Sequence, residues 1–266
     1  MVKDVLSCPH STPDFSERQF CFFKLHLLLF VIYNDIRKQR KGGLDMTEKI
    51  NMHSDLIDED LKKGLKDVLG KLTGPVTVKA VVDSGSEKGQ EMAGFLSVIA
   101  SLSGYISLEL YGTDEEGAEE LDRALLPAAG LYKDGRYSGI SFHGVPGGQE
   151  INSFVLALYN LAGPGQQIGY WTKKKIEKIE GNVKIRVCVS LACHHCPKMV
   201  SACQRLATLN DGIEAAMIDA NLFPQLVEKY KIERVPLTII DEDEKISGVK
   251  TIDEMAELVK MHVKKK

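Results

Sequence analysis

The chain has 266 residues, a formal net charge of −3 and a hydrophobic content of 44%. This length accommodates one large domain or two small ones, and the composition is ordinary for a globular protein. A charge so close to neutral argues against a nucleic-acid-binding surface. The three lysines at 264–266 are therefore interpreted as a solvated tail.

The cysteines are few for this length and unevenly placed. Two lie in the first segment and four lie close together near the end: Cys8, Cys21, Cys188, Cys193, Cys196 and Cys203. This spacing differs from the distributed disulfide framework of small secreted domains. It favours a location in the reducing cytoplasm.

The first segment contains an apolar run at residues 20–33. The run is shorter than the roughly 20 residues that span a bilayer, and Lys24 and His26 interrupt it. No small-residue cleavage site follows it, so we expect neither a membrane anchor nor a signal peptide. Because the regular pattern begins only after Met46, residues 1–54 are interpreted as an extension that is disordered or, up to residue 45, untranslated.

The pattern becomes regular from about residue 55. An apolar stripe between Leu56 and Leu72 predicts a helix, with Ser54 or Asp55 as its N-cap and Gly74 as its stop. The next elements are predicted in this order: a strand at 76–82, a helix after the turn at 83–86, a strand at 105–111, a hairpin of strands 128–132 and 136–142, and a helix at 151–161.

The run Gly163-Pro164-Gly165 interrupts this pattern, and the same order of elements then recurs. The predicted elements are a helix at 168–179, strands at 183–189 and 213–218 flanking a helix at 197–209, a short helix at 222–230, and a strand at 237–240 that turns at 241–245 into a short partner strand. Thr251 and Glu254 form a capping box for the last helix.

Each unit therefore has the order helix, strand, helix, strand, hairpin, closing helix. A strand–helix–strand order produces parallel pairing, whereas a hairpin produces antiparallel pairing. We predict an α/β protein of two fused copies of one fold, at 55–163 and 166–266, each a mixed sheet flanked by helices. The strand-to-helix turn of the first copy, at 83–86, contains no cysteine, so only the second copy is expected to be redox-active.

The motif Cys193-His194-His195-Cys196 occupies the equivalent turn of the second copy and is followed at once by Pro197. Unpaired backbone N–H groups and the helix dipole favour a thiolate at such a turn, and a thiolate is the species that attacks disulfides. We predict that Cys193 is the catalytic nucleophile and that Cys196, one turn further, is the catalytic resolving thiol. Cys188 and Cys203 are interpreted as small core residues.

A metal site is the competing interpretation, because the motif contains four possible ligands. Adjacent residues on one turn cannot all converge tetrahedrally on one ion, and the chain has no second CxxC. The prediction is therefore that no metal is bound.

The chain from about Leu61 to Val259 resembles the N-terminal region of the flavoprotein subunit of alkyl hydroperoxide reductase. The resemblance rests on four segments: residues 190–197 around the CHHC motif, residues 149–158, Val235-Pro236, and its counterpart Leu126-Pro127. It implies two fused thioredoxin-like, or glutaredoxin-like, folds, the first redox-inactive and the second redox-active.

In that family a flavin- and nicotinamide-binding reductase module follows the two folds. This sequence contains no Gly-x-Gly-x-x-Gly dinucleotide fingerprint. The expectation is a free-standing shuttle protein that binds no cofactor itself, with FAD and NAD(P)H on a partner flavoprotein.

The resemblance also suggests a catalytic role for Glu150. If the two folds pack together, a partly buried carboxylate there takes and returns the proton of Cys196. The alternative is a first-turn glutamate that complements the helix dipole.

Four further residues are assigned to substrate binding. A cis peptide at Val235-Pro236 would expose the Val235 backbone to an incoming disulfide-bearing segment, whereas an ordinary trans-proline would simply begin a strand. His194 and His195 either stabilise the Cys193 thiolate or only fill the exposed turn.

The predicted function is that of a cytoplasmic dithiol–disulfide oxidoreductase. It would relay electrons from a separate NAD(P)H-dependent flavoprotein disulfide reductase to a disulfide protein, with a peroxiredoxin favoured and with no nucleic-acid or membrane partner. The alternatives are a general protein disulfide reductase or isomerase, a glutathione-dependent glutaredoxin, and a metal-binding or scaffold module whose thiols do not turn over.

Overall fold

The computed structural model of the protein describes residues 53–265. The predictions for the N-terminal extension, including those for the apolar run at 20–33, fall outside this range. No helix between residues 53 and 265 is both long enough and apolar enough to cross a bilayer.

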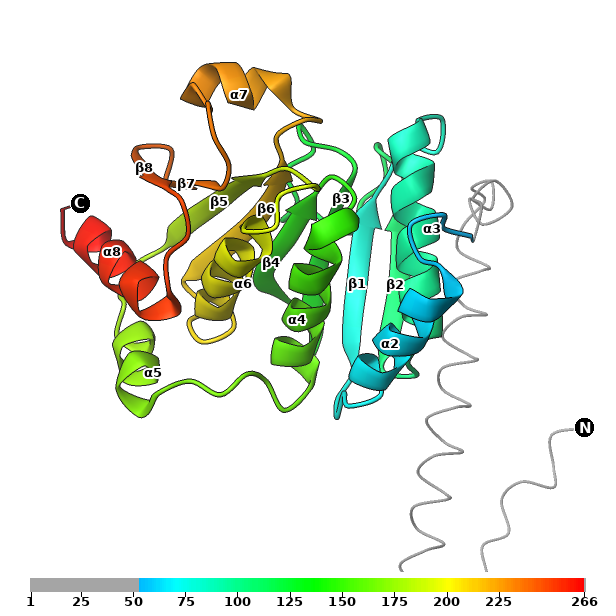
Figure 1. Cartoon of the computed structure of the whole chain (residues 1–266), viewed down its shortest axis with the longest axis horizontal. Coiled ribbons are helices and arrows are strands. Elements are labelled where there is room, and N and C mark those ends of the chain that lie inside the picture. Colours follow the sequence, from blue (N-terminus) through cyan, green and yellow to red (C-terminus); the bar gives the residue numbers. More distant parts are fainter. Residues whose placement is uncertain (1–52, 266) are drawn as a thin grey trace, which may run out of the picture. The chain divides into compact units, whose positions relative to one another are not determined.

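One eight-stranded sheet runs through the described residues, with the strand order β2-β1-β3-β4-β6-β5-β7-β8 (Figure 1). The strands are β1 (Val76–Val81), β2 (Ile106–Tyr111), β3 (Ala128–Lys133), β4 (Arg136–His143), β5 (Val183–Val189), β6 (Ile213–Asp219), β7 (Leu237–Ile240) and β8 (Glu244–Ser247). The helices are α2 (Glu59–Leu69), α3 (Glu87–Ser101), α4 (Ile151–Ala162), α5 (Tyr170–Glu177), α6 (Cys196–Ala207), α7 (Pro224–Tyr230) and α8 (Ile252–Lys265). A short 3-10 turn, η2 (Gly148–Glu150), leads directly into α4.

The two halves of the sheet follow the same pairing scheme. In the first half β1 pairs in parallel with β2 and antiparallel with β3, which pairs antiparallel with β4. In the second half β5 pairs in parallel with β6 and antiparallel with β7, which pairs antiparallel with β8. The predicted α/β class, with mixed sheets flanked by helices, is therefore confirmed.

The halves are joined edge to edge by a parallel pairing of β4 with β6. Helices α4 and α6 contact each other and lie side by side in front of the sheet (Figure 1). Strands of alternating or continuous apolar residues bury one or both faces under these helices. We retain the division into folds at 55–163 and 166–266 as a proposal.

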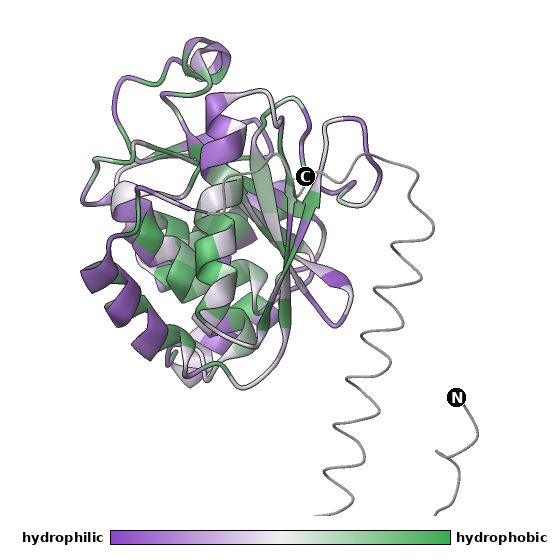
Figure 2. Ribbon diagram, turned by 90° about the vertical axis from the view of Figure 1, so that its right-hand side faces the viewer, coloured by the Kyte–Doolittle hydropathy of each residue, from purple (hydrophilic) through white to green (hydrophobic). Residues whose placement is uncertain are grey.

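The core contains large apolar side chains from both the sheet and its covering helices. Phe154 of α4 packs edge-to-face against Phe95 of α3 and Phe142 of β4, with ring centroids 5.6 and 5.0 Å apart. All three rings are fully buried. Figure 2 shows hydrophobic residues gathered where helices face the sheet and hydrophilic residues on the outer surfaces.

The first helix begins and ends at residues other than those predicted. Its N-cap is Asp58, whose carboxylate accepts a hydrogen bond from the Leu61 N–H at 2.8 Å. Ser54 instead accepts from the Leu56 N–H at 3.3 Å within a turn that precedes the helix. The helix ends at Gly70, whose N–H bonds to the Lys66 carbonyl. Several capping residues close together in the sequence compete, and the local turn decides between them.

Candidate active site

The CHHC motif lies where the end of β5 meets the start of α6. The Cys193 N–H donates to the Ser190 carbonyl at 2.9 Å, which closes the turn after the strand. Pro197 occupies the first turn of α6, where a missing N–H costs nothing. The local sequence thus ends the strand and begins the helix within a few residues.

Cys193 and Cys196 form a disulfide, with their Cα atoms 5.5 Å apart. The two sulfurs differ in access to solvent, because Cys193 is half-buried and Cys196 is completely buried. An incoming disulfide can therefore reach Cys193 first. This is the asymmetry expected of a nucleophile and a resolving thiol.

The helix N-terminus points at the outer sulfur. The Cys196 N–H lies 3.2 Å from Cys193 Sγ and donates to it. The same N–H would stabilise a thiolate at Cys193 after reduction, because an anion accepts a hydrogen bond from an otherwise unpaired donor at a helix start.

The peptide bond between Val235 and Pro236 is cis, as predicted, and so is its counterpart between Leu126 and Pro127. The Val235 carbonyl oxygen lies 3.9 Å from Cys193 Sγ. The oxidised sulfur carries no proton, so this is a contact and not a hydrogen bond. Val235 is half-buried and Pro236 is buried, so part of the Val235 backbone borders the site.

Glu150 is completely buried at the end of η2, which packs on α6. The turn is fixed to the motif's own loop, because the Gln149 N–H donates to the Leu191 carbonyl at 2.9 Å. Glu150 holds the N-cap position of α4, yet its side chain caps no backbone N–H. A carboxylate that only complemented the helix dipole would be expected at the surface.

Burial raises the pKa of Glu150 to about 7, against a partial opposing effect from Ser153 and a smaller contribution from the negative charge of Asp219. The Ser153 hydroxyl donates to Glu150 Oε2, while Oε1 is buried with no hydrogen-bond partner. A carboxyl with this pKa exchanges a proton near neutral pH. Ser153 and Asp219 were missed by sequence reasoning, since neither lies in a recognisable motif.

Asp219 ends β6 and is connected to the motif through side-chain hydrogen bonds. Its carboxylate accepts from the Asn221 N–H at 3.1 Å, and the Asn221 side chain donates to the Ser190 hydroxyl at 3.4 Å. Burial raises the pKa of Asp219, while Lys88 of α3 opposes that rise. Charged groups from both halves therefore surround the buried side of the dithiol.

The remaining sequence-predicted residues are placed simply. His194 and His195 are exposed on the turn. Cys188 and Cys203 are fully buried free thiols in the core, as predicted, and burial raises the pKa of Cys188 to about 12. No cluster of three or more potential metal ligands occurs among residues 53–265.

Comparisons with known proteins agree with this geometry. Residues 183–260 match the family model described as a thioredoxin domain. The chain is 34% identical to the alkyl hydroperoxide reductase flavoprotein, AhpF, of Pseudomonas putida over 68% of this chain and 33% of that protein, so it spans about a third of that relative's length.

Two solved structures share the architecture. The NTD domain of the alkylhydroperoxide reductase AhpF from Enterococcus faecalis has 39% identity and a TM-score of 0.72, covering 76% of this chain and 99% of that one. A protein disulfide oxidoreductase from Aeropyrum pernix has a TM-score of 0.71 at 20% identity, covering 80% of this chain and 95% of that one, and shows the likeness in fold.

The paired thioredoxin-like folds and the asymmetric dithiol define a thiol–disulfide oxidoreductase. Within that class the chain belongs to the family of the N-terminal region of AhpF, the flavoprotein subunit of alkyl hydroperoxide reductase. The predicted fold class and family are both confirmed.

Proposed function

We propose that this protein relays two electrons from an NAD(P)H-dependent flavoprotein disulfide reductase to a disulfide protein, favouring a peroxiredoxin. The observation that carries the proposal is the asymmetry of the dithiol. The half-buried Cys193 sulfur accepts a hydrogen bond from the Cys196 N–H at 3.2 Å, while the Cys196 sulfur is enclosed.

The delivery of electrons begins with the Cys193 thiolate of the reduced protein. It attacks the partner disulfide, forming a mixed disulfide and releasing one partner sulfur as a thiolate that takes up a proton from solvent. Cys196 then loses its proton and attacks the Cys193 sulfur. The Cys193–Cys196 disulfide forms, the second partner sulfur leaves as a thiolate, and two electrons have passed to the partner.

Glu150 is proposed as the acceptor of the Cys196 proton, which it later returns when the disulfide is reduced again. Its complete burial, its unpaired Oε1 and its pKa of about 7 support this assignment. The Val235–Pro236 backbone and the exposed His194 and His195 are proposed to receive the partner segment that carries the disulfide, because the Val235 carbonyl borders Cys193.

The donor and the location complete the proposal. FAD and NAD(P)H are assigned to a partner flavoprotein, and no cofactor is assigned to this chain beyond its redox-active disulfide. A cytoplasmic location is proposed because the other two cysteines of the described region are buried free thiols and not a structural disulfide.

Reconstitution tests the proposal. A flavoprotein disulfide reductase, a peroxiredoxin, NAD(P)H and peroxide are mixed with and without this protein, and nucleotide oxidation is followed. We expect oxidation to require the protein, to be lost in Cys193→Ser, and to persist in the control Cys203→Ala, which removes a buried thiol outside the motif. Oxidation at the same rate with Cys193→Ser would refute the relay.

A further inference from the structure

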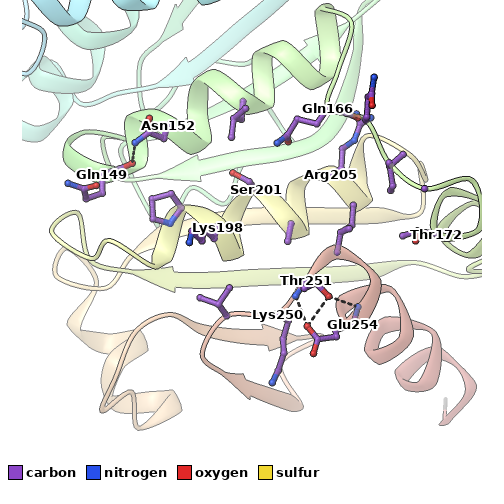
Figure 3. Close-up of a pocket in the computed structure, with 18 of the residues that line it drawn as sticks. Gln149, Asn152, Gln166, Thr172, Lys198, Ser201, Arg205, Lys250, Thr251 and Glu254 are labelled. Atoms are coloured by element: carbon purple, nitrogen blue, oxygen red, sulfur yellow. Dashed lines mark hydrogen bonds between the residues drawn. The ribbon is translucent and has the colours of Figure 1, made fainter.

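A cavity of about 730 Å³ runs along the outer face of α6, beside the active-site motif (Figure 3). Its walls are the start of α4, the connection at 166–169, the start of α5, and residues 249–254. His194 of the motif lines one part of it and Thr172 of α5 lines another. We call this cavity the α6 groove.

The α6 groove carries an excess of positive charge. Lys198 and Lys250 line it, and neither forms an ion pair with any residue of the region 53–265. Glu254 is the only carboxylate among the lining residues, and it is engaged by the N–H and hydroxyl of Thr251. An acidic ligand would therefore meet two unpaired cations.

The floor of the groove also has hydrogen-bonding groups that nothing in the described chain satisfies. Ser201 Oγ and Arg205 Nε are both buried at the atom level and have no partner. The Arg205 guanidinium is held in place by its hydrogen bond to the Gln166 carbonyl at 2.8 Å. Buried polar atoms are usually paired, so these two indicate an occupant that supplies acceptors.

An exposed aromatic pair adjoins the groove at α5. Tyr170 and Trp171 stack edge-to-face with centroids 5.2 Å apart, and 64% and 81% of their surfaces are exposed. They directly precede Thr172, which lines the groove. Exposed aromatic side chains of this kind are typical anchors at protein interfaces.

We propose that the α6 groove and the Tyr170–Trp171 pair form a docking surface for an extended acidic peptide segment containing apolar residues. The segment belongs to the disulfide-bearing partner and lies beside the disulfide that Cys193 attacks, so this inference rests on the proposed function. Its carboxylates pair with Lys198 and Lys250, its backbone carbonyls accept from Ser201 and Arg205, and an apolar side chain covers Trp171.

The tryptophan provides a direct readout, since the chain contains a single one. The probes are two short disulfide-linked peptides of alternating charged and leucine residues, one with glutamate and one with lysine. In the oxidised protein we expect the glutamate peptide to shift the Trp171 fluorescence saturably and the lysine peptide not to do so. In the reduced protein we expect the glutamate peptide to have the lower KM for reduction.

Charge reversal tests the assignment of the cations. In the double variant Lys198→Glu, Lys250→Glu the ratio of the two KM values should shift by about fivefold or more toward the lysine peptide, as expected from losing surface ion pairs. The matched control is Lys63→Glu, Lys66→Glu on α2, which makes the same change in net charge on exposed residues outside the groove. It should leave the ratio unchanged.

The docking surface is overturned if the reduced protein reduces both peptides with equal KM, or if the two double variants behave alike. The proposed function survives that result, because dithiol exchange with both peptides is still observed. Failure to reduce either peptide contradicts the proposed function instead, and the fluorescence titration then still tests docking on its own.

Discussion

At the scale of single residues, the site combines an accessible sulfur with a buried proton acceptor. Cys193 receives the Cys196 N–H, and Cys196 is enclosed on the side where η2 packs. The cysteines and the cis-proline were predictable from the motif and the family resemblance. The hydrogen bond from Ser153 to Glu150 was not, because no spacing in the sequence indicates which hydroxyl a buried carboxylate will meet.

The titration of Glu150 predicts a pH dependence of stability. Its pKa rises from 4.5 to about 7 on folding, so the folded state binds the proton more tightly. The resulting stabilisation is fully present below pH 4.5 and is lost as the pH rises through about 7, amounting to about 3 kcal/mol. Urea unfolding of wild type and Glu150→Gln at pH 5 and 8 should show this loss in the wild type alone. Parallel pH profiles for the two proteins would contradict the buried carboxylate.

At the scale of elements, most helices and strands followed from local pattern and capping chemistry. The α8 capping box is the clearest case, since the Glu254 N–H donates to the Thr251 hydroxyl and the Thr251 N–H donates to Glu254, as predicted. The start of α2 was misplaced because Ser54, Asp55 and Asp58 are all good caps in sequence, and only the turn before the helix selects Asp58.

The α8 cap can be tested by substitution. Thr251→Ala removes the acceptor of the Glu254 N–H and should lower the free energy of unfolding by about 1 kcal/mol, whereas Thr251→Ser keeps the hydroxyl and should change it little. Chemical denaturation of the three proteins measures the difference. Equal losses in both variants would show that the methyl group, and not the cap, is responsible.

At the scale of the whole molecule, the halves are joined by β4–β6 pairing and by the contact of η2 with the motif loop. Neither join was predictable, because pairing between edge strands and packing of one loop on another depend on three-dimensional complementarity. The groove along α6 was missed for the same reason, as its walls come from segments far apart in the sequence.

The contact between η2 and the motif loop depends on Gly148. It has a φ of +55°, and a Cβ there would lie 2.6 Å from the Leu191 carbonyl oxygen. Gly148→Ala should therefore lower stability by more than the roughly 1–2 kcal/mol of left-handed strain alone. Gly135→Ala is the matched control, since its φ is +76° but nothing lies within 4 Å. Similar losses of unfolding free energy in the two variants would argue against a tight contact.

The most direct test of the relay is to trap its intermediate. In Cys196→Ser the resolving thiol is absent, so attack by Cys193 on a disulfide partner should stop at a mixed disulfide. Intact-mass and peptide mass spectrometry of that variant, incubated with an oxidised peroxiredoxin, should show one partner molecule attached through Cys193 and released by reductant. An adduct on Cys188 or Cys203, or none while the wild-type protein still reduces the partner, would contradict the assigned chemistry.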